Sequence, residues 1–112
     1  LYEGLNWEPI TGDFDIIDGV KAILTPGHSP GTQSVAIQTK KGTAVVTGFC
    51  CIRENFEVPR EVTELYPTWT VLAPGFHNDV LAAFDSVVKI QQIADLIIPD
   101  HEPELFKIKR IP

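Results

Sequence analysis

The sequence predicts an α/β fold (α+β in layer terms), with a mostly antiparallel sheet and one long helix packed on it. Three observations predict it: two pairs of β-prone segments in the first half of the 112-residue chain, one long amphipathic segment, and a short apolar segment after it. Because a sheet and a helix each bury one face against the other, these elements make a layered domain. We expect residues 1–112 to form a single domain or half-domain.

Both strand pairs have the turn chemistry of hairpins. Residues 14–17 and 20–24 are separated by Asp18-Gly19, a dipeptide typical of two-residue hairpin turns. Residues 34–39 alternate apolar and polar side chains, and residues 43–47 contain an Ala-Val-Val run, with Lys-Lys-Gly between them. The first of these two strands is expected to have one wet face, and the second to be buried on both faces. For residues 1–12 the pattern predicts either an edge strand or an irregular segment that leads into the first strand.

The second half of the chain predicts a long loop, a helix and a strand. Prolines interrupt the stretch after Gly48, in which only Trp69 to Leu72 favours a strand. Apolar residues then recur at helical spacing, which predicts a helix from Asp79 to Ala94 with Asn78 as its N-cap. Residues 96–98 predict a short buried strand.

Composition excludes several classes of function. The chain is 44% hydrophobic and 21% charged, which is ordinary for a globular protein. A net charge of −6 with scattered basic residues argues against a nucleic-acid partner. No apolar run approaches the roughly 20 residues that cross a bilayer, and no signal segment opens the chain. We therefore expect a cytoplasmic protein without a membrane partner, and, because the chain begins at Leu1 and contains no Met, a piece of something longer.

Two adjacent cysteines, Cys50 and Cys51, follow the second strand pair. A disulfide between neighbouring residues strains the bond geometry, so both are expected to be thiols. Apolar packing is the ordinary role of such residues. A redox-sensing thiol module is the alternative, which would require a thiol that reacts readily at neutral pH.

Two of the three histidines follow apolar strands at proline-rich corners. His28 lies between two Pro-Gly-type corners, where Pro26 and Pro30 restrict the backbone and Gly27 and Gly31 permit positive φ. His101 follows the last predicted strand. Loops at strand ends meet at one edge of a sheet, where neutral imidazoles bind metals, although a solvent-exposed turn histidine remains the alternative. The third histidine, His77, is interpreted as a surface residue at a helix start.

These segments, taken in order, resemble the C-terminal half of a metallo-β-lactamase-fold hydrolase. The resemblance is carried by Thr-Pro-Gly-His-Ser-Pro-Gly at residues 25–31, by a buried strand ending at Gly48, and by Ile-Ile-Pro-Asp-His at residues 97–101. Residues 53–57 and 86–90 are most similar to the N-acyl homoserine lactonase branch. The resemblance implies an αββα sandwich in which two metal ions, usually zinc, activate a hydroxide that attacks a lactone or other ester-like or thioester carbonyl of a small-molecule substrate.

Carried over by position, the resemblance makes His28 and His101 metal ligands and leaves the other ligands without a match. The His-x-His-x-Asp-His signature is absent from this chain, and no aspartate occurs at residues 48–51, where the bridging carboxylate is expected. A cysteine thiolate replaces that carboxylate only if its side chain points into the cleft.

Two expectations follow from these departures, one with an alternative. The chain is expected to be inactive alone as the C-terminal portion of a metal-dependent hydrolase; the alternative is a non-catalytic, metal-free scaffold or assembly domain. The sheet face that would pack on an N-terminal half is left open, which predicts a homo-oligomer or association with that half.

Overall fold

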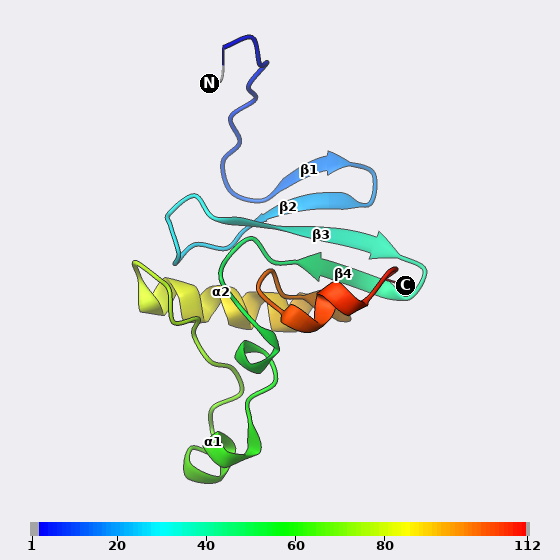
Figure 1. The fold of residues 1–112 in the computed structure, drawn as a ribbon. Coiled ribbons are helices and arrows are strands. Elements are labelled where there is room, and N and C mark those ends of the chain that lie inside the picture. Colours follow the sequence, from blue (N-terminus) through cyan, green and yellow to red (C-terminus); the bar gives the residue numbers. More distant parts are fainter. Residues whose placement is uncertain (1–2, 112) are drawn as a thin grey trace.

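Five strands form one sheet in the computed structural model, which describes residues 3–111. They are β1 (Phe14–Ile17), β2 (Val20–Leu24), β3 (Gln33–Thr39), β4 (Gly42–Val46) and β5 (Leu96–Ile98). Their order in the sheet follows the sequence, and every neighbouring pair is antiparallel except β4 and β5, which are parallel. The predicted α+β class and mostly antiparallel sheet are confirmed (Figure 1).

Both predicted hairpins are present. Gly19 has a φ of +75° in the turn between β1 and β2, which an L side chain rarely adopts. Its carbonyl also accepts a hydrogen bond of 2.8 Å from the backbone N–H of Gln38 on β3. Ala44 and Val45 of β4 project to opposite faces and are 4% and 0% exposed, as expected for a strand buried on both sides.

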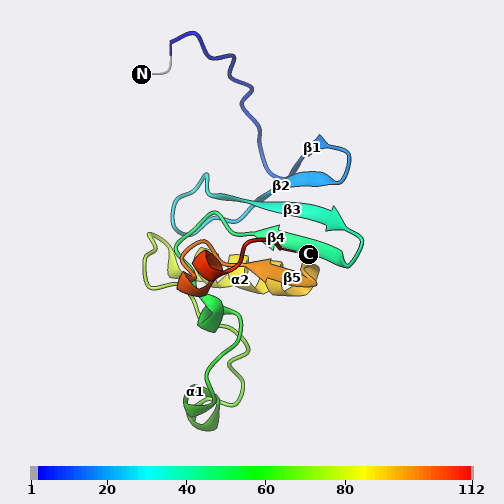
Figure 2. The same cartoon turned by 45° about the vertical axis from the view of Figure 1, so that its right-hand side comes forward.

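The main helix, α2 (Val80–Ile93), lies on one face of this sheet (Figure 2). Its apolar side chains Val87 and Ile90 pack with Ile23 and Val45 of the sheet in one buried cluster. The N-cap prediction was wrong by one residue. Asp79 caps the helix, because its Oδ1 accepts a hydrogen bond of 3.0 Å from the N–H of Ala82.

The stretch between β4 and α2 contains two helical segments that the sequence did not predict. They are the 3₁₀ helix η1 (Arg53–Asn55) and the short helix α1 (Arg60–Leu65), which stands away from the sheet in Figure 1. Trp69 to Leu72 is not a strand. Its backbone is held instead by side-chain amides, with Asn55 Nδ2 donating to the carbonyl of Leu72 and Gln91 Nε2 to that of Thr70, each at 3.1 Å.

The two ends of the described chain are irregular. Residues 3–13 enter β1 without forming a strand, and a second 3₁₀ helix, η2 (Pro103–Lys107), follows β5. Leu1 and Tyr2, which belong to the predicted entry segment, lie outside the described residues. Between residues 3 and 111, no helix combines the length and apolar character needed to cross a membrane.

Candidate functional site

Three strands end at the same edge of the sheet. Because β2 and β4 are each antiparallel to β3, and β5 is parallel to β4, strands β2, β4 and β5 all run in one direction. The loops that follow them carry His28, the Cys50-Cys51 pair and His101. We call this side of the sheet the carboxyl edge. The expected placement of both histidines at one edge of the sheet therefore agrees with the topology.

The loop that carries His28 is held between the sheet and the start of α2. At its base, the Thr25 N–H donates a hydrogen bond of 2.9 Å to the carbonyl of Thr32. At its tip, the carbonyl of Gly27 accepts hydrogen bonds from the N–H groups of Asn78 and Asp79, at 2.8 and 3.1 Å. Gly27 has a φ of +132°, which glycine tolerates and other residues rarely adopt. These contacts fix the loop on the helix N-terminus.

The His28 imidazole is half-buried against Phe76. Its Nδ1 lies 3.2 Å from the carbonyl oxygen of Phe76, and the two rings are 5.3 Å apart between centroids. Asn78, the residue expected to cap the helix, instead donates its Nδ2 to the backbone carbonyl of His28 at 2.9 Å. With Nδ1 directed at a carbonyl, Nε2 is the ring nitrogen of His28 that remains for a ligand.

His101 is exposed, and its backbone joins the ends of β4 and β5. Its N–H donates a hydrogen bond of 3.0 Å to the carbonyl of Cys51, and the N–H of Asp100 donates to Thr47 Oγ1 at 2.9 Å. Glu102 Oε2 accepts a hydrogen bond of 3.0 Å from the N–H of Arg53, which lowers the pKa of the Glu102 carboxyl. The segment is therefore anchored on both sides of the histidine.

Thr47 and Ser34 are site-supporting residues that the sequence analysis did not single out for this role. Thr47 Oγ1 contacts both Cys51 Sγ and the Asp100 N–H, and Ser34 Oγ lies 2.9 Å from Thr25 Oγ1. Ser34 Oγ also accepts a hydrogen bond of 3.2 Å from the Gly48 N–H. Both side chains are almost fully buried. The sequence does hold a signal for this role, because both are hydroxyl residues within or just after apolar strands. A hydroxyl buried at such a position needs a hydrogen-bond partner.

The two cysteines are free thiols, as expected. The Cys51 side chain is 1% exposed, and its thiol donates a hydrogen bond of 3.0 Å to Thr47 Oγ1. Burial raises the pKa of this thiol. Metal ligation and redox reactivity both require a thiolate, so this environment disfavours Cys51 as a replacement for the missing carboxylate and as a redox sensor. Cys50 is half-buried.

The described residues do not by themselves make a metal site. Within residues 3–111, no three histidine, cysteine, aspartate or glutamate side chains are grouped so that they could hold an ion. His77 is not brought into a cluster either, because its Nδ1 lies 2.7 Å from the carbonyl of Pro74. A stable zinc site needs at least three protein ligands, so a site that used His28 and His101 would need ligands from outside this set.

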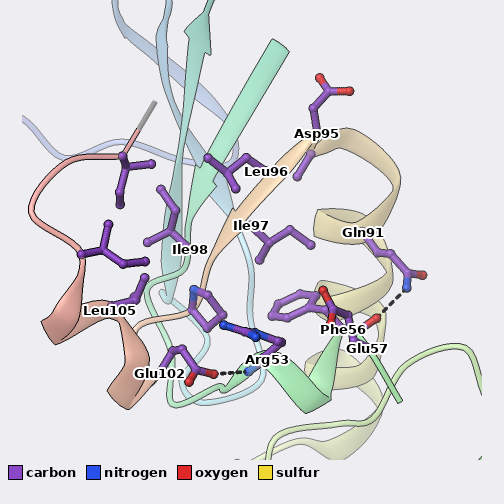
Figure 3. Close-up of a pocket in the computed structure, with 14 residues that line it drawn as sticks. Arg53, Phe56, Glu57, Gln91, Asp95, Leu96, Ile97, Ile98, Glu102 and Leu105 are labelled. Atoms are coloured by element: carbon purple, nitrogen blue, oxygen red, sulfur yellow. Dashed lines mark hydrogen bonds between the residues drawn. The ribbon is translucent and has the colours of Figure 1, made fainter. Parts of the chain in front are cut away.

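A cavity of about 520 Å³ lies beside β5 (Figure 3). Ile97 faces Phe56 and α2 on one side of the strand, whereas Ile98 faces Leu105 of η2 on the other. The polar groups of Arg53, Glu57 and Gln91 line it as well, but neither His28 nor His101 does. This cavity is therefore separate from the two candidate ligands.

Comparison with known proteins points to one group of enzymes. No family model matches the chain. The N-acyl homoserine lactonase of Bacillus cereus is 44% identical over 59 residues, which cover 51% of this chain and 24% of that protein. The N-acyl homoserine lactonase AiiA of Bacillus thuringiensis subsp. kurstaki is 42% identical over 55 residues, covering 47% of this chain and 22% of that protein.

Solved structures agree with the sequence relatives. An N-acyl homoserine lactone hydrolase, with the product N-hexanoyl-L-homoserine bound at its catalytic metal centre, superposes with a TM-score of 0.68 and 27% identity. The match covers 97% of this chain and 41% of that one. A probable metal-dependent hydrolase from Staphylococcus aureus shares the fold, with a TM-score of 0.55 and 16% identity over 83% of this chain and 31% of its own.

This chain thus spans about a quarter of the length of the curated relatives in sequence, and two fifths of the lactone hydrolase in structure. The resemblance seen in the sequence is confirmed by both kinds of comparison. In sequence and in structure, the chain is similar to part of the N-acyl homoserine lactonases.

Proposed function

We propose that this chain is the C-terminal portion of a metal-dependent hydrolase that acts on a lactone or another ester-like or thioester carbonyl. In this proposal His28 and His101 contribute two imidazole ligands, and the remaining ligands come from chain outside residues 3–111. Zinc is the proposed metal, because imidazole nitrogen suits it. The chain alone is then inactive.

The placement of the two histidines at the carboxyl edge carries the proposal. His28 and His101 follow β2 and β5, two strands that run in the same direction. Hydrogen bonds to Phe76 and Asn78 hold the first loop, and hydrogen bonds to Cys51 and Thr47 hold the second. Metal-binding side chains need rigid loops, because a side chain that moves freely loses entropy when it binds the metal.

The role of this chain's residues is therefore to position side chains rather than to complete a centre. Asn78 binds the His28 backbone, and Thr47 binds the backbone beside His101. The Cys51 thiol, which donates to Thr47, stabilises the same turn. Within residues 3–111, the metal that would perform the chemistry has too few ligands.

The test is a chimera in which this chain replaces the matching part of the Bacillus thuringiensis lactonase. We expect the chimera to bind metal and to hydrolyse N-hexanoyl homoserine lactone, and His28→Ala or His101→Ala to reduce metal, measured by elemental analysis, to a substoichiometric amount. His77→Ala is the matched control and should leave metal unchanged. A folded chimera whose metal content ignores both changes would contradict the proposal.

A metal-free scaffold is the second candidate, and two observations favour it. The described residues hold no group of three ligands, and the buried Cys51 thiol is engaged with Thr47. Measuring the metal content of the chain alone does not separate the scaffold from the hydrolase portion. The metal content of the chimera must be measured as well. A scaffold binds no metal in either form, whereas a hydrolase portion gains metal when the rest of the fold is supplied.

A further inference from the structure

Three buried hydroxyl residues lie on three neighbouring strands at the carboxyl edge. They are Thr25 after β2, Ser34 near the start of β3 and Thr47 after β4, and all three are almost fully buried. We call them the hydroxyl row. Buried hydroxyls need hydrogen-bond partners. The partners of these three lie in the loops around the two candidate ligands: the His28 loop (residues 25–32), the middle loop (residues 48–52) and the His101 segment (residues 99–102).

Ser34 connects the His28 loop to the middle loop. Its Oγ lies 2.9 Å from Thr25 Oγ1, at the base of the His28 loop, and accepts a hydrogen bond of 3.2 Å from the N–H of Gly48. A Cβ at Gly48 would overlap the carbonyl oxygen of Gln33, so glycine is the residue that lets the middle loop approach β3 this closely. One buried side chain thus holds the starts of both loops.

Thr47 connects the middle loop to the His101 segment. Its Oγ1 accepts hydrogen bonds from the Cys51 thiol at 3.0 Å and from the N–H of Asp100 at 2.9 Å. The Cys51 carbonyl in turn accepts a hydrogen bond of 3.0 Å from the N–H of His101. The middle loop is therefore bonded to the His28 loop through Ser34 and to the His101 segment through Thr47 and Cys51.

Other contacts hold the His28 loop separately. Ser86 Oγ on α2 donates a hydrogen bond of 2.7 Å to the carbonyl of Pro26, and Asn78 Nδ2 donates to the carbonyl of His28 at 2.9 Å. Neither contact involves the His101 segment. The hydroxyl row differs from them because it links the loops of the two histidines to each other.

We propose that Ser34 and Thr47 are positioning residues that couple the His28 loop to the His101 segment, so that a shift of one histidine loop shifts the other. Two imidazoles whose loops are coupled lose less entropy when they bind one metal centre. This consequence for metal binding rests on the proposed function. The coupling itself is a property of the hydrogen bonds of this chain and requires no metal.

Amide hydrogen exchange of the chain, resolved by NMR, measures the coupling. Ser34→Ala removes the acceptor of the Gly48 N–H, and the freed middle loop should then release the His101 N–H as well. Both amides should exchange about 2- to 10-fold faster, which corresponds to the net contribution of one hydrogen bond. The N–H of Gln38, which donates to the Gly19 carbonyl near the other end of β3, should keep its rate. A general loss of stability would change that rate too.

Ser29→Ala is the matched control for the His28 loop. The Ser29 hydroxyl lies 2.9 Å from Thr32 Oγ1 within the same loop and does not belong to the hydroxyl row. Its removal should leave the exchange of the His101 N–H unchanged. A folded Ser34→Ala variant in which only Gly48 exchanges faster would overturn the proposal, because the two histidine loops would then be independent.

A reciprocal pair of variants decides if Ser34→Ala fails to fold. Thr47→Val keeps the shape of the side chain and removes its hydroxyl, whereas Thr47→Ser keeps the hydroxyl. We expect Thr47→Val to speed the exchange of the Thr25 N–H, at the base of the His28 loop, and Thr47→Ser to retain the unmodified rate. Equal Thr25 rates in both variants would contradict the coupling.

Zinc affinity of the chimera with the Bacillus thuringiensis lactonase is the second readout. Ser34→Ala should weaken zinc binding by about 10- to 100-fold, the usual effect of removing a residue that orients metal ligands. Unchanged affinity in that variant would overturn the positioning role. A chimera that binds no zinc before any change would contradict the proposed function instead, and the exchange rates of the chain would still decide the coupling.

Discussion

Alanine at Gly27 should be strongly destabilising, because this residue lies where the His28 loop meets α2. Gly27 has a φ of +132°, and a Cβ there would lie 2.4 Å from the Cα and N atoms of Ala83. These are backbone atoms of a helix, so they cannot move aside as the end of a flexible side chain does. The carbonyl of Gly27 also accepts two hydrogen bonds from the helix N-terminus, at Asn78 and Asp79.

The expected loss of stability combines two costs. A non-glycine residue in the left-handed region costs about 1–2 kcal/mol. Relief of the overlap with Ala83 requires a shift of loop or helix, and overpacking of this kind costs about 1–3 kcal/mol. Gly27→Ala should therefore lower the free energy of unfolding by roughly 2–5 kcal/mol, which is a large share of the roughly 5–15 kcal/mol that a domain has.

Urea denaturation followed by circular dichroism, at one protein concentration, measures this loss. Gly31→Ala is the matched control in the same loop, because its added Cβ meets no heavy atom within 4 Å and its φ is not left-handed. That variant should stay within about 1 kcal/mol of the unmodified chain. Equal midpoints for the two variants would refute the close packing of Gly27 on α2.

Two further predictions concern titratable groups. The Lys89 ammonium donates to both carboxylate oxygens of Asp13, at 2.8 and 3.1 Å, and holds the pKa of that carboxyl below its ordinary value of 3.8. Because the folded-state pKa is the lower one, this contribution to stability is present above the unfolded-state pKa and is lost as the pH falls through the folded-state pKa. Denaturation midpoints measured from neutral pH down to about pH 3 should therefore fall less steeply for Asp13→Asn, and an unchanged slope would count against the pair. The Cys51 thiol should react with a disulfide reagent only as fast as the chain unfolds, while Cys50 reacts in the folded state; equal rates, compared in Cys50→Ser and Cys51→Ser, would contradict the buried hydrogen bond to Thr47.

The local elements were predictable because their signals lie within a few residues of chain. The Asp18-Gly19 turn and the β-prone residues around it predict the first hairpin without knowledge of anything distant. The period of apolar residues predicts α2 in the same way. The placement of His28 and His101 at one edge also followed from the sequence, since it needs only the direction of the strands that precede them. Their role as metal ligands stays a prediction, as does the cytoplasmic location.

Contacts between distant segments were decided by the tertiary structure. Asn78 and Asp79 are both good N-cap residues, and the choice fell to Asp79 because the carbonyl of His28, 50 positions away, binds the Asn78 amide. Trp69 to Leu72 has the composition of a strand, yet its backbone groups are bound by the side chains of Asn55 and Gln91.

The sequence by itself thus determined the strands, the helix and the loops on which the candidate ligands lie, since local propensity and periodicity act over short distances. Only the tertiary structure decided that the Cys51 thiol is turned inward to Thr47 and that Val87 and Ile90 of α2 pack in one buried cluster with Val45 of the sheet. The physical reason is that burial depends on which segments pack together, and packing is settled by the chain as a whole.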